Sequence, residues 1–439
     1  MIVSPLWRGK SFAVLGLARS GAASVHALLA GGARVVAWDT DEQRRDHIRA
    51  RAVGQDLVLA DPLEVDLADF DALIVSPGVP LNRHPVAAKA RAAGIPIIGD
   101  IELFAQARPA LPAHKVVGIT GTNGKSTTTA LVHHILQNAG ISSLMGGNIG
   151  LPVLEQTPLP EGGVYVLELS SYQIDLTVSL DCEVAVLLNL TPDHLDRYDG
   201  FAAYAASKAG LFAMQATTHD AIIGIGDTPS ALIARSLSGR GEHLTKIAPG
   251  VCMDQSRWPS LQGPHNAQNA LAAIAVCQAL GVPEAMIDRG LESFAGLPHR
   301  MERVAVRGGV TFVNDSKATN AASTAPALAA WPAKDGRPRI HWILGGVAKS
   351  DNLDECAPHF ANVAHAYTIG EAGHMFADLL RGSMAVDDSE MLSAAVRRAA
   401  RIAQPGDVIL LSPACASFDQ FRDFEARGDA FVAAVAALD

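Results

Sequence analysis

The sequence predicts an α/β protein of three domains, each built around a largely parallel sheet. Short apolar stretches typical of buried strands alternate with stretches of helical periodicity along almost the whole chain, which is the pattern of βαβ units. Several strands end in glycine-rich or polar loops, where open parallel sheets bind ligands. A chain of 439 residues is also too long for one hydrophobic core. We place the domains at 1–103, 104–297 and 298–439.

Composition narrows the class of protein. Apolar residues make up 49% of the chain, enough for large cores, and no apolar stretch approaches the roughly 18–20 residues of a membrane span. The net charge of −10 and the lack of a basic run argue against a nucleic-acid partner. The chain starts with a strand instead of a signal peptide. The cysteines lack metal or redox spacing, so we expect reduced core residues in a cytoplasmic protein: Cys182, Cys252, Cys277, Cys356 and Cys415.

The N-terminal domain begins with a candidate nucleotide-binding unit. A strand over Phe12–Leu15 runs into the turn Gly16–Gly21, which opens a helix, and a second strand over Arg34–Trp38 ends at Asp39. An acidic residue about 20 positions after such a turn is where a ribose hydroxyl binds in dinucleotide-binding folds. Ala18 stands where the second glycine of that fingerprint is expected. These features predict a Rossmann-like domain.

A further strand in this domain, Leu73–Val75, runs into the small-residue turn Ser76-Pro77-Gly78. In a parallel sheet this turn lies at the same edge as Gly16–Gly21 and Asp39. We therefore expect a nucleotide-containing ligand, which need not be NAD. A plain scaffold domain without a ligand is the alternative.

The central domain opens with the segment around which the chain is organised. The strand Lys115–Thr120 leads into Gly121-Thr122-Asn123-Gly124-Lys125-Ser126-Thr127, and a helix follows until Gly140. Backbone N–H groups and a helix N-terminus can cradle phosphates here, a lysine can bind the β/γ-phosphates, and a serine hydroxyl can hold Mg²⁺. Ile119 stands where the usual pattern has glycine, so the loop is a variant. We predict a P-loop ATPase-like parallel sheet that binds ATP.

Other polar residues follow strands of the same domain. Glu168 ends the strand Val164–Leu167, where a Mg²⁺ ligand belongs, although a salt bridge at the strand end is the alternative. His194 follows the next strand, so it lies at the same edge. Lys208 lies on a helix with apolar neighbours, and the residues alone favour a solvated helix lysine.

Two asparagines precede a helix that we expect over Ala270–Leu280. Asn266 and Asn269 lie three apart and face the same way. An amide carries both a donor and an acceptor, which suits a purine edge, whereas helix capping is the alternative.

The C-terminal domain begins after a hinge at Gly296–Arg300. Three of its strands are followed by loops of small, polar or cationic residues: Asn314–Asn320, Gly345–Lys349 and Ser412–Phe421. A parallel sheet brings all three loops to one edge, so we predict a second Rossmann-like domain with a binding face there. Its larger aromatic residues are predicted to be core: Trp331, Trp342 and Phe360.

Taken together, these motifs resemble the Mur ligase family, the cytoplasmic ATP-dependent enzymes that build the peptidoglycan stem peptide. The signatures span essentially the whole chain: Gly121–Thr127, Glu168–Ser171, Asp193–Tyr198, Leu297–Arg300 and Asn314–Asn320. Within the family the chain resembles the members that add D-glutamate, through Gly99–Phe104, Asn314–Asn320 and Leu411–Gly428. The Asp-Asn-Pro-Arg segment of the diaminopimelate-adding members is absent.

The resemblance implies ATP, UDP-N-acetylmuramoyl-L-alanine and D-glutamate as substrates and two Mg²⁺ sites. We also expect a monomer. It assigns ATP to Gly121, Thr122, Asn123, Gly124, Lys125, Ser126, Thr127, Asn266, Asn269, Arg300, Asp315 and Lys317. It assigns the UDP substrate to Ser20, Asp39, Thr40, Ser76, Gly78 and Asn148. It assigns D-glutamate to Thr319, Lys349, Ser417 and Phe424. The metal ligands are then Ser126, Glu168, His194 and Lys208 as a carbamate, and the catalytic residues are Lys125, Glu168, His194, Lys208 and Arg300.

Two departures from the family and three other functions stay open at this point. Ala18 and Arg19 depart from the pattern expected of the uridine site. Val347 and Ala348 stand where an acidic residue is expected before Lys349. The nearest alternative is a ligase like folylpolyglutamate synthetase, which adds glutamate by similar chemistry but lacks a nucleotide-binding-like domain before the phosphate loop. An NAD-dependent oxidoreductase built on Gly16–Gly21 and Asp39, and a nucleotide-binding regulator without catalysis, are the others.

Overall fold

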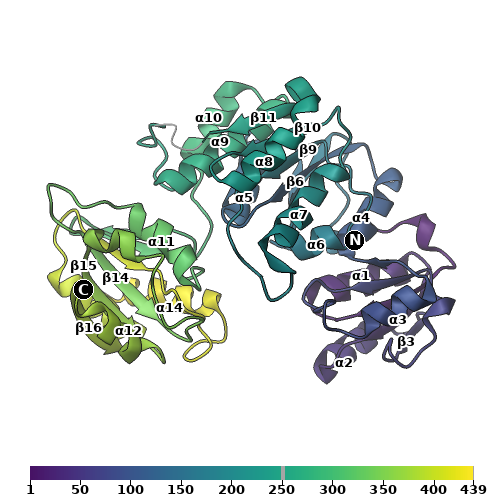
Figure 1. The fold of residues 1–439 in the computed structure, drawn as a ribbon, viewed down its shortest axis with the longest axis horizontal. Helices are drawn as coiled ribbons and strands as arrows, with labels where there is room; N and C mark the ends of the chain where they lie inside the picture. The colour runs from purple at the N-terminus through teal and green to yellow at the C-terminus, as the bar shows by residue number, and fades with distance from the viewer. Residues whose placement is uncertain (249–252, 439) are drawn as a thin grey trace. The chain divides into compact units, whose positions relative to one another are not determined.

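The computed structural model describes residues 1–248 and 253–438, and it contains three separate sheets in successive parts of the chain (Figure 1). The chain forms two compact units. The first comprises Met1–Pro249 and Gln268–Leu291 and holds two of the sheets, and the second comprises Gly250–Ala267 and Glu292–Asp439. The predicted α/β class with three sheets is confirmed.

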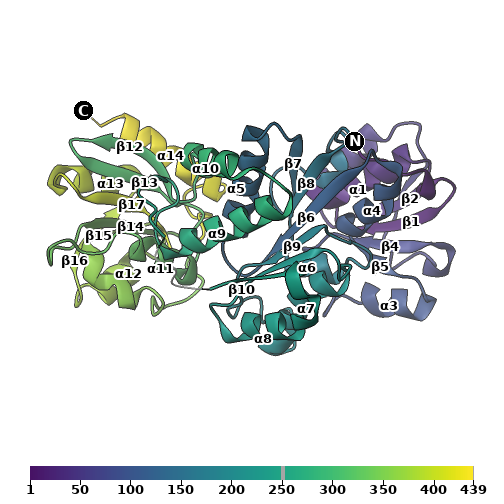
Figure 2. The same ribbon diagram turned by 90° about the horizontal axis from the view of Figure 1, so that it is seen from above.

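The N-terminal sheet is fully parallel, with the order β3-β2-β1-β4-β5. Its strands and helices are β1 (Ser11–Leu15), α1 (Arg19–Ala30), β2 (Arg34–Trp38), α2 (Glu42–Arg51), β3 (Leu57–Leu59), β4 (Ala72–Val75), α3 (Val86–Ala93), β5 (Ile97–Ile98) and α4 (Asp100–Ala107). Phe12 and Val14 point into the cluster around α1, whereas Ala13 and Leu15 point into the cluster around α3. The sheet is therefore covered on both faces, as Figure 2 shows.

The central sheet is also parallel, with the order β11-β10-β9-β6-β8-β7. Its strands are β6 (His114–Thr120), β7 (Ser143–Gly147), β8 (Gly163–Glu168), β9 (Val184–Leu187), β10 (Asp220–Gly224) and β11 (Leu244–Ile247). Its helices are α5 (Lys125–Asn138), α6 (Ser171–Asp175), α7 (Gly200–Ala213), α8 (Thr228–Ser236), α9 (Pro264–Ala279) and α10 (Glu284–Ser293). Strand β6 lies between β8 and β9, so the loops after these three strands meet at one edge.

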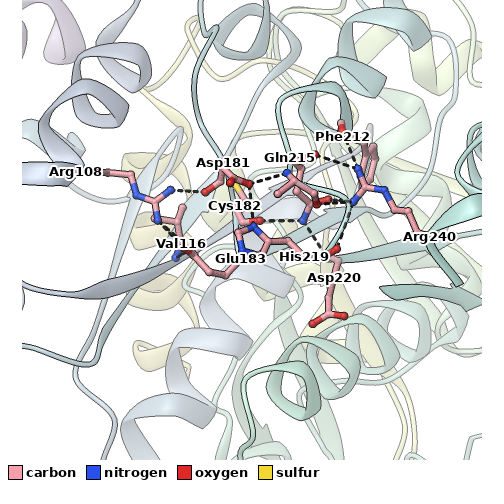
Figure 3. A network of polar contacts seen from close by, with 11 residues as sticks. Arg108, Val116, Asp181, Cys182, Glu183, Phe212, Gln215, His219, Asp220 and Arg240 are labelled. Carbon is pink, nitrogen blue, oxygen red and sulfur yellow. Dashed lines mark hydrogen bonds and ion pairs between the residues drawn. The ribbon is translucent and has the colours of Figure 1, made fainter. Parts of the chain in front are cut away.

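A polar network secures the opposite edge of the central sheet (Figure 3). Glu183, just before β9, accepts hydrogen bonds from Arg108 at 2.8 Å and from the Val116 N–H of β6 at 2.5 Å. The buried Arg240 donates to the Gln215 side chain at 2.5 Å and to the Phe212 carbonyl at 2.9 Å. These contacts fix where the strands start and leave their carboxyl ends to the loops.

The C-terminal sheet has the order β12-β13-β17-β14-β15-β16 and is parallel except for the edge strand β12. Its strands are β12 (Glu302–Arg307), β13 (Val310–Asn314), β14 (Ile340–Gly345), β15 (Val363–Ile369), β16 (Ala385–Glu390) and β17 (Val408–Leu411). Its helices are α11 (Ala321–Ala329), α12 (Gly373–Leu380), α13 (Leu392–Ile402) and α14 (Phe424–Ala436). Helices α11 and α12 cover one face, and α13 and α14 cover the other.

Short 3₁₀ helices complete the described structure: η1 (Pro5–Trp7), η2 (Leu67–Asp69), η3 (Arg108–Ala110), η4 (Val153–Glu155), η5 (Ser238–His243) and η6 (Ala357–Asn362). Of the helices in the described part of the chain, none is both long and apolar enough to cross a membrane. The cysteines at 182, 277, 356 and 415 are buried and free, as predicted, whereas Cys252 lies outside the described residues. Trp342 is fully buried, and Trp331 and Phe360 pack against the same core, which confirms their structural role.

Candidate active site

A cavity of about 590 Å³ lies at the carboxyl edge of the N-terminal sheet. It is formed by the ends of β1, β2 and β4 together with the segment that follows β7. All the residues predicted to hold the UDP substrate line it: Ser20, Asp39, Thr40, Ser76, Gly78 and Asn148. The structure therefore brings this predicted set together.

Two glycines, Gly16 and Gly21, allow the close turn between β1 and α1 that forms one wall of this cavity. Gly16 has φ of +87°, and a Cβ there would lie 2.8 Å from the Ser76 Cβ. A Cβ on Gly21 would lie 1.8 Å from the Gly16 carbonyl oxygen, so α1 can approach β1 closely only with glycine at this position. As a result the Ser20 and Ser76 hydroxyls come within 3.2 Å of each other at the cavity wall.

The carboxylate of Asp39 is held firmly at the end of β2. It accepts hydrogen bonds from the Leu17 N–H at 2.6 Å and the Asp41 N–H at 2.9 Å, and it pairs with Arg44 at 3.3 Å. Burial alone raises the pKa of Asp39, but the two backbone hydrogen bonds and Arg44 outweigh it and lower the pKa below its ordinary value. Asp39 is therefore an anion that ties the glycine-rich turn to the second strand.

The cavity also has lining residues outside the set predicted to hold the UDP substrate. The additional polar ones are Arg19, Arg44, His84 and Gln173. Arg19 and Arg44 carry a signal that was available, because cations next to a predicted nucleotide site suit phosphate groups. Gln173 carried no such signal, since it belongs to α6 of the central sheet and reaches the cavity only through the fold.

The phosphate loop has the backbone shape expected of a phosphate cradle. Gly121 and Gly124 have φ of +145° and +87°, whereas Ile119 is buried in β6. The positive φ angles of this loop thus fall on Gly121 and Gly124, and position 119 is an ordinary strand residue that does not require glycine. The Lys125 ammonium folds over the loop and donates to the carbonyls of Gly121 at 2.9 Å and Thr122 at 2.7 Å.

Glu168 connects the phosphate loop to the N-terminal cavity. Its side chain at the end of β8 is buried and accepts hydrogen bonds from the Ser126 hydroxyl and from the Asn148 amide, the latter at 2.9 Å. Ser126 belongs to the first turn of α5, and Asn148 lines the cavity. One carboxylate therefore contacts both predicted substrate regions, and the salt bridge considered for Glu168 is absent among the described residues.

Lys208 is not the solvated lysine that its neighbours suggested. Its side chain on α7 is only 2% exposed, its ammonium lies 3.4 Å from the Thr120 hydroxyl, and it stands 4.9 Å from the centre of the Tyr204 ring. Burial, followed by repulsion from Lys125, lowers the pKa of Lys208 to about 7. A neutral amine is therefore available near neutral pH, next to the phosphate loop.

His194 lies in the loop after β9, in a left-handed conformation with φ of +54°. Its ring stands 5.1 Å from Tyr172 and 6.4 Å from Tyr204, so Tyr204 neighbours both His194 and Lys208. Burial lowers the pKa of His194 although Asp193 opposes this, which favours the neutral imidazole. A neutral imidazole is the form that binds metals.

Arg197 anchors the His194 loop to the N-terminal sheet. Its guanidinium lies 4.3 Å from the centre of the Tyr172 ring and donates to backbone carbonyls of the turn after β4, including that of Val79 at 2.8 Å. The loop that carries His194 is thus tied to the turn that carries Gly78.

In the described residues, no group of three or more His, Cys, Asp or Glu side chains is arranged so that it could hold a metal ion.

We predicted that Asn266 and Asn269 precede a helix, but both belong to the helix itself. Helix α9 begins at Pro264, because Gly263 takes a left-handed conformation and proline suits the first helical position. Asn269 lies against the phosphate loop, where a Cβ on Gly124 would come within 2.2 Å of its Oδ1. Asn266 lines a separate cavity of about 290 Å³ in the second unit.

In the second unit the carboxyl edge carries the remaining predicted residues. Asp315 is buried and accepts hydrogen bonds from the Ser412 hydroxyl at 2.8 Å and the Met301 N–H at 3.1 Å. Burial raises the pKa of Asp315 to about 7, against the effects of these bonds and of Arg300. The Lys317 ammonium lies 4.0 Å from the centre of the Phe424 ring. The structure therefore brings together residues predicted for ATP and for D-glutamate.

Three of the residues predicted for D-glutamate lie on three different loops of this edge, and the fourth, Phe424, begins α14. Ser417 is buried, Thr319 is partly buried, and Lys349 is exposed. The departure at Val347 has a structural role of its own, because its backbone exchanges two hydrogen bonds of 2.9 Å with Ala416. The Lys349 loop is thus joined to the Ser417 loop by main-chain bonds that do not depend on the residue type at 347.

Comparisons with known proteins agree with this geometry. Sequence profiles match the Mur ligase MurD-like N-terminal domain over residues 10–99, the Mur ligase middle domain over 119–249 and the glutamate ligase domain over 299–415. The match over 10–99 argues against the folylpolyglutamate-synthetase-like alternative.

Relatives and solved structures were also found over the full length. A protein of Novosphingobium aromaticivorans called UDP-N-acetylmuramoylalanine--D-glutamate ligase is 63% identical, with 100% of this chain and 97% of that protein covered. One of the same name from Sphingopyxis alaskensis is 59% identical, with both chains fully covered. The structure of UDP-N-acetylmuramate-alanine ligase MurC from Thermotoga maritima is 17% identical, with a TM-score of 0.59 over 98% of this chain and 99% of its own. MurF from Acinetobacter baumannii is 18% identical, with a TM-score of 0.61 over 97% of this chain and 91% of its own. The sequence matches and the shared fold show that this chain belongs to the Mur ligase family.

Proposed function

We propose that the chain is an ATP-dependent ligase that joins D-glutamate to UDP-N-acetylmuramoyl-L-alanine in the cytoplasm. The name shared by its full-length relatives states these two partners. The single observation that carries the proposal is the position of Glu168. Its carboxylate contacts Ser126 of the phosphate loop and Asn148 of the N-terminal cavity. A sugar nucleotide in that cavity and ATP on that loop are thereby brought to one reaction centre.

The proposed reaction has two steps. An oxygen of the alanyl carboxylate attacks the γ-phosphorus of ATP, and the bond from that phosphorus to the β-phosphate oxygen breaks. The products of this step are an acyl phosphate and ADP. The amino nitrogen of D-glutamate then attacks the acyl carbon, gives up a proton, and expels inorganic phosphate from a tetrahedral intermediate. Such phosphoryl transfers need positioning and charge neutralisation more than covalent help from the protein.

The residues of the first unit supply the positioning. The N–H groups of the loop 121–127 and the N-terminus of α5 bind the phosphates, and Lys125 exchanges its two loop carbonyls for phosphate oxygens. Asn269, packed against Gly124, completes the nucleotide side of the loop. The cavity residues, from Ser20 to Asn148, hold the UDP part and leave the alanyl end towards Glu168.

We propose that residues of the second unit contact ATP and D-glutamate. Arg300, Asp315 and Lys317, with Asn266, are proposed to bind ATP. Thr319, Lys349 and Ser417 of the three loops, and Phe424 at the start of α14, are proposed to bind D-glutamate, in line with the match of residues 299–415 to the glutamate ligase domain. We keep the proposed domain boundaries at 1–103, 104–297 and 298–439, and we propose that the enzyme is a monomer.

Mg²⁺ fits the residues at the edge of the central sheet. Ser126 and Glu168 offer oxygen ligands of the kind that Mg²⁺ prefers, in a buried position beside the phosphate loop. His194, with its lowered pKa, is available as a neutral ligand at a second site. When bound, Mg²⁺ neutralises the negative charge that accumulates on the phosphates and on the acyl phosphate.

Lys208 fits a carbamate ligand for the second site. A neutral lysine amine adds to CO₂, losing a proton and becoming a carboxylate-bearing anion. The lowered pKa of Lys208 makes the neutral amine accessible, and the change from cation to anion converts its repulsion with Lys125 into attraction. Mass analysis of the native protein tests this assignment, because a carbamate adds the mass of CO₂ at Lys208.

The experiment that tests the proposed function is phosphate release from ATP with UDP-N-acetylmuramoyl-L-alanine and one amino acid at a time. The amino acids are D-glutamate, L-glutamate, diaminopimelate and L-lysine. Release with D-glutamate alone supports the proposal, and release with another amino acid keeps the ligase but moves its specificity. No release with any of them contradicts the proposal, and NAD(P)H fluorescence and ATP binding then test the oxidoreductase and regulator alternatives.

A further inference from the structure

Arg427, in the first turn of α14, is a fully buried arginine that the proposed mechanism does not use. A guanidinium has five N–H donors, and here each meets one protein oxygen. The Nε donates to the Ser316 hydroxyl at 3.0 Å, and Nη2 donates to the carbonyls of Ser316 at 2.9 Å and Cys415 at 3.0 Å. Nη1 donates to the carbonyls of Ala416 at 3.3 Å and Gly345 at 3.4 Å.

These five oxygens belong to the three loops of the binding edge. Ser316 lies after β13, Gly345 ends β14, and Cys415 and Ala416 follow β17, and the three strands are adjacent in the order β13-β17-β14. Each loop carries residues proposed to bind ligand. The first has Asp315, Lys317 and Thr319, the second has Lys349, and the third has Ser417. One side chain therefore fixes the positions of all three loops relative to one another.

The surrounding backbone is shaped around this guanidinium. Gly346 has φ of +128°, and a Cβ there would lie 2.2 Å from the Ala416 carbonyl oxygen and 3.2 Å from Nη1 of Arg427. The Ser316 hydroxyl, which accepts from Arg427, donates in turn to the Phe424 carbonyl at 2.8 Å. Phe424, proposed to contact D-glutamate, is thus held by the same set of bonds.

Arg427 keeps its charge without a carboxylate in direct contact, although the charge of Asp419 favours the protonated form. Among the described residues, no carboxylate forms an ion pair with it, and its contacts are carbonyl and hydroxyl oxygens. Burying a cation is costly unless its donors are satisfied, and here all of them are. Burial lowers the pKa of Arg427 to about 10, so the side chain stays protonated at neutral pH. The three loops are therefore held by charge-assisted hydrogen bonds, which are the strong class.

We propose that Arg427 is the positioning residue of the amino-acid site, and that it acts by holding the three loops in the arrangement that receives D-glutamate. The identity of the ligand rests on the proposed function, whereas the action on the loops does not. Arg427 touches no ligand itself, because its donors are all committed to the protein. The N-terminal cavity belongs to the other unit, so binding of the UDP substrate is independent of Arg427.

The test is the substitution Arg427→Lys in the full chain. Lysine keeps the positive charge but has three donors on one atom, so it cannot replace a planar group that reaches three loops. We expect faster amide hydrogen exchange in 315–320, 345–349 and 413–418. We also expect the KM for D-glutamate to rise about tenfold or more, since small misplacements of binding groups have effects of this size. The KM for UDP-N-acetylmuramoyl-L-alanine is expected to stay unchanged.

Arg240→Lys is the matched control. Arg240 is also a buried arginine, held by the Phe212 carbonyl and the Gln215 amide oxygen among other contacts (Figure 3). It lies in the first unit, away from the three loops. We expect this variant to lose stability without faster exchange in the three loops and without a change in the KM for D-glutamate. Ser316→Ala removes one acceptor of Arg427 and is a milder second variant, expected to change exchange in the same direction.

Each outcome decides the proposal. Loop exchange as slow in Arg427→Lys and Ser316→Ala as in the wild type overturns it. An equal rise in the KM for both substrates also overturns it, because it indicates general damage. If the wild type shows no D-glutamate-dependent phosphate release while Arg427→Lys still speeds exchange in the loops, the proposed function fails and the positioning role stands.

Discussion

Replacing Asp315 by asparagine is expected to stabilise the C-terminal sheet at alkaline pH while it abolishes ATP turnover. The asparagine fits the site. Its Oδ1 can accept from the Met301 N–H as the carboxylate does, and its amide can donate to the Ser412 hydroxyl. That hydroxyl can turn its own proton to Thr324, whose Oγ1 lies 3.1 Å away. The change therefore removes the charge without leaving a buried group unpaired.

The magnitude follows from the pKa of Asp315, which burial raises from 3.8 to about 7. The folded state holds this proton more tightly than the unfolded chain does. Below pH 3.8 the carboxyl is protonated in both states and does not lower the free energy of unfolding. As the pH rises towards 7, it lowers the free energy of unfolding by an increasing amount. The full cost is about 4 kcal/mol, and between pH 5 and pH 8 it increases by about 2–3 kcal/mol.

The assay is native-state hydrogen exchange of the amides in β13 and β17, together with the Asp315 N–H, which follows β13 and donates to the Leu411 carbonyl at 2.7 Å. Rates are corrected for the intrinsic effect of pH. We expect the stability gain of Asp315→Asn over the wild type to grow between pH 5 and pH 8. Asp378→Asn, at an exposed position of the same unit, serves as the control and should show no such trend. A gain that does not change with pH would refute the reasoning.

Three further substitutions test the central sheet. Lys125→Ala should abolish phosphate release and leave binding of the UDP substrate and the thermal unfolding profile intact; activity near the wild-type level would exclude the proposed role. Gly124→Ala should weaken ATP binding, measured by calorimetry, because its Cβ would lie 2.2 Å from the Asn269 Oδ1 at a φ of +87°; unchanged affinity would contradict the close fit between the loop and α9. Lys208→Ala should be inactive and should recover activity when acetate-like anions replace the carbamate. If no anion restores activity, and the native protein carries no carbamate by mass analysis, the carbamate assignment is wrong.

Much of the site could be predicted because it follows a local rule. In parallel sheets, polar residues at the ends of strands meet at one edge, whatever the rest of the chain does. The turn after β1, the phosphate loop, Glu168 after β8 and the loops after β13, β14 and β17 were all recognisable as strand–loop transitions. Their strands lie where the apolar stretches indicated, and β2 begins and ends at the predicted residues.

Other features depended on which faces of the elements pack together. Helix α7 carries alanine, phenylalanine and leucine on nearly every side, so its periodicity does not reveal which side meets the sheet, and the burial of Lys208 could not be predicted from it. The start of α9 at Pro264 depended on the left-handed turn at Gly263, and the expectation of a later start was wrong.

By itself, the sequence determined the order of strands and helices, the phosphate loop, and the polar residues that the strands carry to the edges of three largely parallel sheets. These are consequences of period, turn chemistry and strand direction, which act over a few residues. Only the tertiary structure decided that Gln173 reaches the N-terminal cavity, that Lys208 is buried beside Lys125, and that Arg427 holds three loops at once. The physical reason is that burial and hydrogen-bond partners depend on segments a hundred or so residues away, which no local pattern encodes.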